Sequence, residues 1–172
     1  MTQRDRDDHP FDKNEQKLRE QFLQVRDVIY KVNDENQVVM APAKVDQITL
    51  AAMRYMKNQQ QNGNNSLDPD RPVDGAALSK ANPMTGVAAG QYMAFYQGTR
   101  EEYEKLRVMG VPTSELGCPA HTSLHDIRTI ESELQQQKLQ LAQRQETDRQ
   151  RDQEQARGRE TDKATPVRSI FS

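Results

Sequence analysis

Residues 11–32, FDKNEQKLREQFLQVRDVIYKV, set the fold that we expect from this sequence. Large apolar side chains recur in it at steps of four, three, four and three, which is the spacing of one face of an α-helix. The residues of this stripe are Leu18, Phe22, Val25, Ile29 and Val32. Asp12 and Glu15 precede the stripe in the pattern of a capping box, which begins a helix. The stretch therefore predicts an amphipathic helix whose apolar face packs against other helices.

Further segments carry apolar residues at helical spacing and extend this prediction along the chain. We expect helices over 44–60, 85–97, 99–109 and from about 122 onward, with a short helical piece at 76–80. Gly86 and Gly90 are expected to let two helices approach closely. No pair of segments alternates convincingly as strands. The predicted fold class is all-α: a compact bundle of four to five helices with a polar C-terminal helical extension and disordered termini.

The predicted domain organisation follows the distribution of apolar residues. We expect a flexible arm over 1–10, the helical bundle over 11–141, and a polar extension with a disordered tail over 142–172. Within the bundle, residues 58–72 contain several Gly, Asn and Pro residues, which break both helix and strand, so they are expected to form a loop. The stripe of the last helix is expected to end at Leu141, beyond which almost no apolar residue follows.

Composition excludes several classes of protein. Lys and Arg number 24 against 26 Asp and Glu, and the pI is about 6.0, so nucleic-acid binding lacks its electrostatic driving force. The longest apolar stretch, 87–96, is too short to span a bilayer. The charged start of the chain lacks the apolar core of a Sec signal peptide. A single cysteine, Cys118, excludes an internal disulfide framework and favours a cytoplasmic protein.

The segment Cys118–His125 is the one place where the sequence suggests chemistry. Cys118, His121 and His125 are three residue types that bind zinc, and the two histidines lie one helical turn apart. The same residues also suggest a cysteine nucleophile with a histidine base. Against both, no second cysteine is present and Pro119 separates Cys118 from the helix. We therefore predict no catalytic, cofactor-binding or metal residues and no cofactor, and keep a small Cys/His enzyme or zinc protein as an alternative.

Aromatic residues are concentrated in a short part of the chain. Tyr92, Phe95, Tyr96 and Tyr103 are expected to pack in the core, and the alternative is an exposed patch that anchors a partner.

The predicted function is that of a non-enzymatic helical interaction protein: an adaptor, a chaperone-like subunit or a regulator. It would bind another protein through its helical faces, with self-association as an alternative. The prediction depends on amphipathic helices, on a modest core and on the lack of a catalytic motif.

A second alternative concerns the end of the chain. Residues 167–172, VRSIFS, place two apolar residues after a Glu-, Arg- and Thr-rich run. This composition resembles the C-terminal signals of bacterial type IV secretion effectors. The resemblance implies a bacterial secreted effector that is translocated out of the cell by a non-Sec route.

Overall fold

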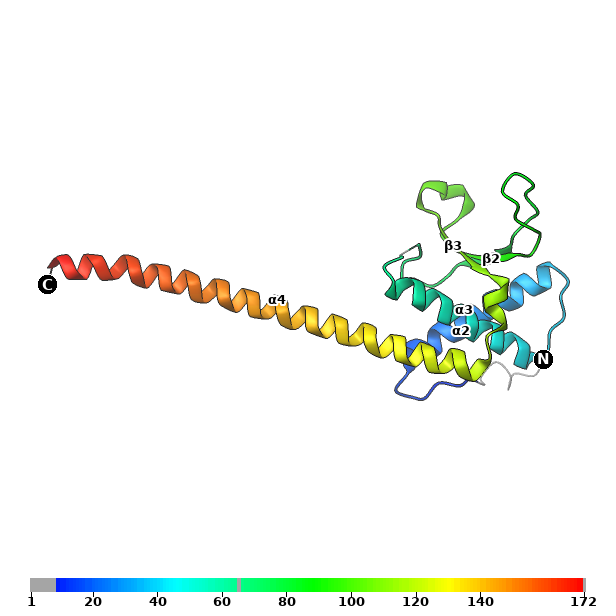
Figure 1. The fold of residues 1–172 in the computed structure, drawn as a ribbon, viewed down its shortest axis with the longest axis horizontal. Helices are drawn as coiled ribbons and strands as arrows, with labels where there is room; N and C mark the ends of the chain where they lie inside the picture. Colours follow the sequence, from blue (N-terminus) through cyan, green and yellow to red (C-terminus); the bar gives the residue numbers. More distant parts are fainter. Residues whose placement is uncertain (1–8, 65, 172) are drawn as a thin grey trace. The chain divides into compact units, whose positions relative to one another are not determined.

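The computed structural model describes the backbone of residues 9–64 and 66–171, and their side chains except those of 100, 103 and 158–171. The elements in chain order are α2 (Gln16–Glu35), α3 (Pro42–Gln61), β1 (Gly75–Leu78), β2 (Tyr92–Gln97), the 3₁₀ segment η1 (Arg100–Lys105), β3 (Arg107–Pro112), the 3₁₀ segment η2 (Thr113–Gly117) and α4 (Ala120–Phe171). Figure 1 shows these elements along the chain.

The chain divides into two units, Met1–Ile130 and Glu131–Ser172. The first contains α2, α3, the sheet and the first turns of α4. The second consists of the remainder of α4, which includes the range where we expected a polar extension and a tail. Ile127 and Ile130 are buried, whereas Leu141, the expected end of the apolar stripe, is 57% exposed. Of the expected N-terminal arm, residues 1–8 lie outside the described part of the chain, and our division into domains stays a prediction.

The all-α prediction is wrong, because the structure contains a three-stranded antiparallel sheet. Its order is β1-β2-β3, with Phe95 opposite Ala76 on one side and opposite Met109 on the other. The expected helices over 76–80, 85–97 and 99–109 are replaced by β1, by β2 with the loop before it, and by η1 with β3. The fold is therefore an α+β arrangement, and not a bundle of four to five helices.

Two glycines explain part of this correction. Gly86 and Gly90 have positive φ angles of 77° and 72°, a conformation that an α-helix does not contain. They shape the loop between β1 and β2, where Asn82 and Val87 form an isolated bridge and the Gly90 N–H donates to the Ser79 carbonyl at 2.8 Å. Their four-residue spacing therefore reflects turn geometry, and the predicted close helix packing at this pair is wrong.

The first two predicted helices are confirmed. All five residues of the stripe in 11–32 are buried on α2. The helix begins at Gln16, slightly later than expected, and half of the capping box forms: Glu15 Oε1 accepts the backbone N–H of Asp12 at 3.0 Å. α3 begins with Pro42 in its first turn, where the missing N–H costs no helical hydrogen bond.

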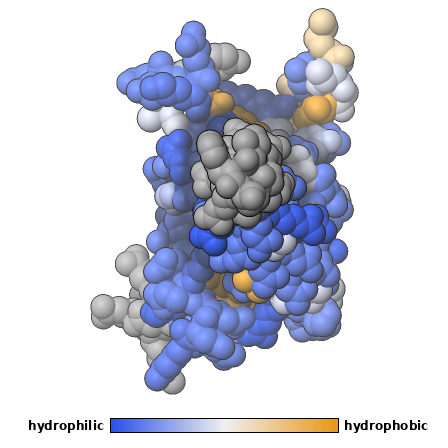
Figure 2. Space-filling view, turned by 90° about the vertical axis from the view of Figure 1, so that its left-hand side faces the viewer, coloured by the Kyte–Doolittle hydropathy of each residue, from blue (hydrophilic) through white to orange (hydrophobic). Residues whose placement is uncertain are grey.

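The surface of the molecule reflects its low apolar content of 34%. The face drawn in Figure 2 is mainly hydrophilic, with hydrophobic atoms in small separate patches. None of the helices in the described part of the chain combines the length and the apolar character needed to cross a membrane.

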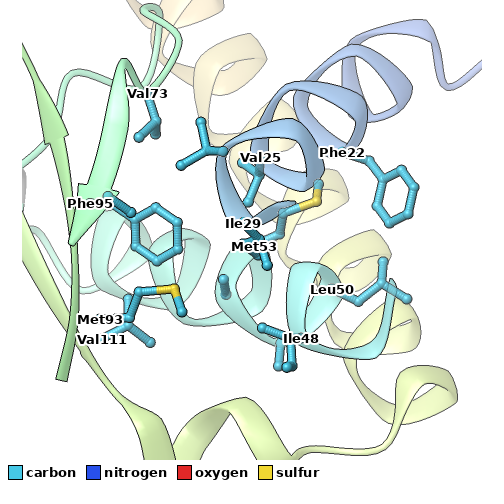
Figure 3. Close-up of a cluster of buried hydrophobic side chains, with 14 of the residues drawn as sticks. Phe22, Val25, Ile29, Ile48, Leu50, Met53, Val73, Met93, Phe95 and Val111 are labelled. Carbon is cyan, nitrogen blue, oxygen red and sulfur yellow. The ribbon is translucent and has the colours of Figure 1, made fainter. Parts of the chain in front are cut away.

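The core lies between one face of the sheet and the two helices α2 and α3. Side chains of the strands point toward those of the helices in Figure 3, and Phe95 lies among residues of both layers. At the outer end of the helix layer, the Phe11 and Phe22 rings meet edge to face with centroids 5.8 Å apart. The Arg26 guanidinium lies 5.1 Å from the Phe22 ring centroid and 3.5 Å from the Asp46 carboxylate, so a buried cation is held between α2 and α3.

Candidate functional site

The structure separates the residues of the expected Cys/His site. Cys118 is half-buried directly after η2, whereas His121 and His125 are exposed on the first turns of α4. Among the described residues, no group of three or more His, Cys, Asp or Glu side chains is arranged to hold a metal ion. The Cys118 carbonyl accepts a hydrogen bond from the Gln47 side chain at 3.3 Å, which fixes the end of η2 to α3.

Arg54 is the charged centre beside Cys118. Its Nε atom donates to Asp126 Oδ2 at 2.7 Å, and its Nη1 atom lies 3.7 Å from Glu115 Oε2. The pKa of Arg54 is raised, first by the hydrogen bond to Asp126, and burial opposes this shift. The guanidinium therefore stays charged and links α3 to η2 and to the start of α4. The cluster of Arg54, Asp126 and Glu115 is therefore a structural link between these three elements.

A second ion pair joins the start of α2 to α4. Arg128 Nε donates to Glu15 Oε2 and Arg128 Nη2 donates to Glu15 Oε1, both at 3.0 Å. This hydrogen bonding lowers the pKa of Glu15 below its ordinary value of 4.5, against the raising effect of burial, and it raises the pKa of Arg128. The folded chain therefore binds the Glu15 proton less readily than the unfolded chain does.

This pair predicts a small acid sensitivity. Its contribution to stability is present above pH 4.5 and is lost as the pH falls from there through the lowered folded pKa. Because Arg128 is 40% exposed, we expect Glu15→Gln to cost at most about 1 kcal/mol at pH 7. In urea titrations the stability difference between the wild type and the variant should shrink as the pH falls below 4.5, and a difference that does not change with pH would contradict the assignment.

Two glutamine amides organise the segment 66–73 next to the sheet. Gln97, only 1% exposed at the end of β2, accepts the Asp68 N–H at 2.8 Å and donates to the carbonyls of Asp68 at 2.9 Å and Arg71 at 3.0 Å. Gln24 on α2 accepts the Val73 N–H at 3.2 Å and donates to the Val73 carbonyl. Each amide pairs with backbone groups as a neighbouring peptide would, so the segment is fixed although it forms no helix or strand.

The fixed segment closes one side of a surface groove of about 410 Å³, which we name the methionine groove. Its other walls come from the first half of α2 and the last turns of α3, and Met109 of β3 lines its floor. The apolar lining consists of Val25, Met53, Met56, Leu67, Pro69, Pro72, Val73 and Met109. The polar lining consists of Lys17, Glu20, Gln21, Gln24, Lys57, Gln60, Asn64, Asp68, Asp70, Arg71 and Gln97.

The groove offers apolar contact more than polar chemistry. Met53 and Met109 are buried, and Met56 is half-buried at the surface of α3. The amides of Gln24 and Gln97 use their donors and acceptors on the segment 66–73, so they are engaged before any ligand arrives. What faces a ligand is therefore a flexible thioether floor with charges of both signs at its rim.

The sequence did not indicate this groove. Gln24 lies inside the predicted first helix, and Gln97 ends the helix predicted over 85–97, which the structure replaces by β2. The aromatic cluster was predicted correctly only for Phe95, which is fully buried, because Tyr92 and Tyr96 lie half-buried on the opposite face of β2. The side chain of Tyr103 lies outside the described residues.

Compared with protein-family models, with curated proteins and with solved structures, the chain has no match.

Proposed function

We propose that this chain is a non-enzymatic protein-binding module that holds a peptide segment of another protein in the methionine groove. The observation that carries the proposal is the groove itself, with its methionine floor and its fixed wall 66–73. Methionine side chains adapt to different apolar shapes, which suits the binding of a partner's side chains.

The distribution of polar groups favours a peptide over a small molecule as the ligand. Small-molecule sites combine an apolar pocket with a few convergent polar groups that orient the ligand. Here the two best-placed amides are engaged by the wall of the groove, and the rim carries both basic and acidic side chains, such as Arg71 and Glu20. A peptide with one or two large apolar side chains between charged residues matches that arrangement. The single cysteine, Cys118, supports a reducing compartment such as the cytoplasm as the place of action.

The proposal predicts that Met56→Glu weakens peptide binding at least about tenfold, because a carboxylate at the apolar floor must be desolvated when a peptide covers it. Short peptides would be selected from a random display library on the wild-type chain. Their dissociation constants would then be measured with the wild type and with Met56→Glu. Amide chemical shifts of the wild type should move around Met53, Met56 and Met109 when the peptide binds.

Met84→Glu is the matched control, because it makes the same substitution at a methionine that is 94% exposed in the loop between β1 and β2. It should bind the selected peptides within about twofold of the wild type. Failure to select any peptide, equal binding by Met56→Glu, or shift changes confined to another surface would each contradict the proposal.

A further inference from the structure

The residues of β3 alternate between pointing their backbone N–H and C=O groups toward β2 and pointing them away from the sheet. The Thr113 N–H donates to the Gln91 carbonyl at 2.9 Å, one position beyond the register pair Tyr92–Pro112. Because hydrogen-bonded and non-hydrogen-bonded pairs alternate in an antiparallel ladder, Val111, Met109 and Arg107 direct their N–H and C=O groups toward β2. Val108 and Gly110 therefore direct theirs away from the sheet.

The opposite side of β2 agrees with this alternation. The Ser79 N–H donates to the Tyr92 carbonyl at 2.8 Å, so the backbone groups of Tyr92 point toward β1. This is the direction expected if the backbone groups of the next residue, Met93, point toward β3. Val108 is 47% exposed, Gly110 is exposed, and no strand within 9–64 and 66–171 pairs with this edge of β3. The edge thus offers two N–H and two C=O groups to a further strand.

The same four groups on a second copy of the chain would supply the matching donors and acceptors. Suppose that a second copy of β3 lies antiparallel, so that Val108 of each copy is opposite Gly110 of the other. Each of these two residue pairs then exchanges two backbone hydrogen bonds, which gives four bonds about a two-fold axis at Met109. Placing Gly110 opposite itself would instead set Val108 against Pro112, which has no N–H to donate. The Val108–Gly110 register uses the N–H and C=O groups of both residues and needs no N–H from Pro112.

We infer that two copies of this chain associate through the outer edges of β3, with Val108 of each opposite Gly110 of the other, to form a continuous six-stranded antiparallel sheet. The inference goes beyond the proposed peptide binding, because neither residue lines the methionine groove. A contact edge of six residues is much smaller than the interface of a permanent dimer, so the association is reversible and depends on concentration.

Sedimentation equilibrium of the full chain tests the inference. The average mass should rise with concentration from 19.7 kDa toward twice that value. Gly110→Pro removes one outward N–H of the edge without removing a bond to β2, and edge strands tolerate proline in this orientation. We expect it to raise the dimer dissociation constant at least about tenfold, while Gly110→Ala leaves it within about twofold. Ala keeps the N–H, and its Cβ would lie 3.7 Å from the Tyr92 ring, an ordinary contact.

Amide exchange provides a second readout that needs no substitution. In the wild type the amides of Val108 and Gly110 should become more protected as the concentration rises, whereas the amide of the exposed Ser114 should not change. A chain that stays monomeric at millimolar concentration would overturn the inference. So would association that Gly110→Pro does not weaken, or concentration-dependent protection confined to α4.

Discussion

Phe95→Ala is expected to destabilise the folded chain by about 3–5 kcal/mol, the usual cost of removing a fully buried aromatic side chain. Phe95 is 0% exposed and lies between the sheet and the two helices, beside Met93 and with its ring directed toward the helix layer (Figure 3). Its removal leaves a cavity that a two-layer packing cannot easily close. Thermal unfolding followed by circular dichroism should show a decrease in Tm on the order of 10 °C.

Tyr96→Ala is the matched control for this prediction. Tyr96 is the next residue, also aromatic, but it lies half-buried on the other face of β2, with its ring against Gly75. We expect a loss of only about 1 kcal/mol, since less apolar surface is uncovered. The strand arrangement therefore predicts a large difference between neighbouring aromatics. Equal losses for the two variants would contradict the observed alternation.

The segment 92–97 shows why the fold class could not be predicted from the sequence. A strand with one buried face should alternate apolar and polar residues, but here Ala94 and the two tyrosines face outward and Gln97 faces inward. The sequence therefore does not show the apolar–polar alternation of a strand, because a polar side chain occupies a core position and apolar ones lie on the outer face. Gln97 is tolerated there because its amide is fully hydrogen-bonded to the segment 66–73.

The helices α2 and α3 could be predicted because their signal is local. Each contains 20 residues, long enough for an apolar stripe to repeat several times, and α3 begins at a proline that favours a first turn. The strands contain only four to six residues, so a few residues decide their period. Local spacing then fits a helix as well as a strand, and pairing between distant segments decides between them.

The methionine groove could not be predicted from the sequence either, because it too depends on contacts between distant segments. Its floor combines Met53 and Met56 of α3 with Met109 of β3, which only the packing of the helix against the sheet brings together. The segment 58–72 was expected to be a loop, and its described residues from position 62 onward, 62–64 and 66–72, form no helix or strand. Gln24 and Gln97 anchor the segment 66–73, and neither the composition nor the spacing of residues in the sequence indicates these contacts.

Gln97→Leu is expected to destabilise the folded chain by about 2–4 kcal/mol. Leucine fills nearly the same volume, so the loss comes from the Asp68 N–H and the Asp68 and Arg71 carbonyls, which are left without their partner. Hydrogen exchange at the Asp68 amide should accelerate at least about tenfold, because the wall of the groove is released from β2. Peptides selected on the wild type should bind the variant more weakly although no floor residue has changed.

Gln16→Leu separates this effect from the general cost of replacing an amide by an apolar group. Gln16 is exposed on α2, where its amide donates only to Glu20 at 3.0 Å, so the change should stay within about 0.5 kcal/mol. If both variants lose similar stability, the three hydrogen bonds of Gln97 are not what fixes the segment 66–73. If Gln97→Leu is destabilised but still binds peptides normally, the fixed wall is a feature of the fold alone and the groove does not depend on it for recognition.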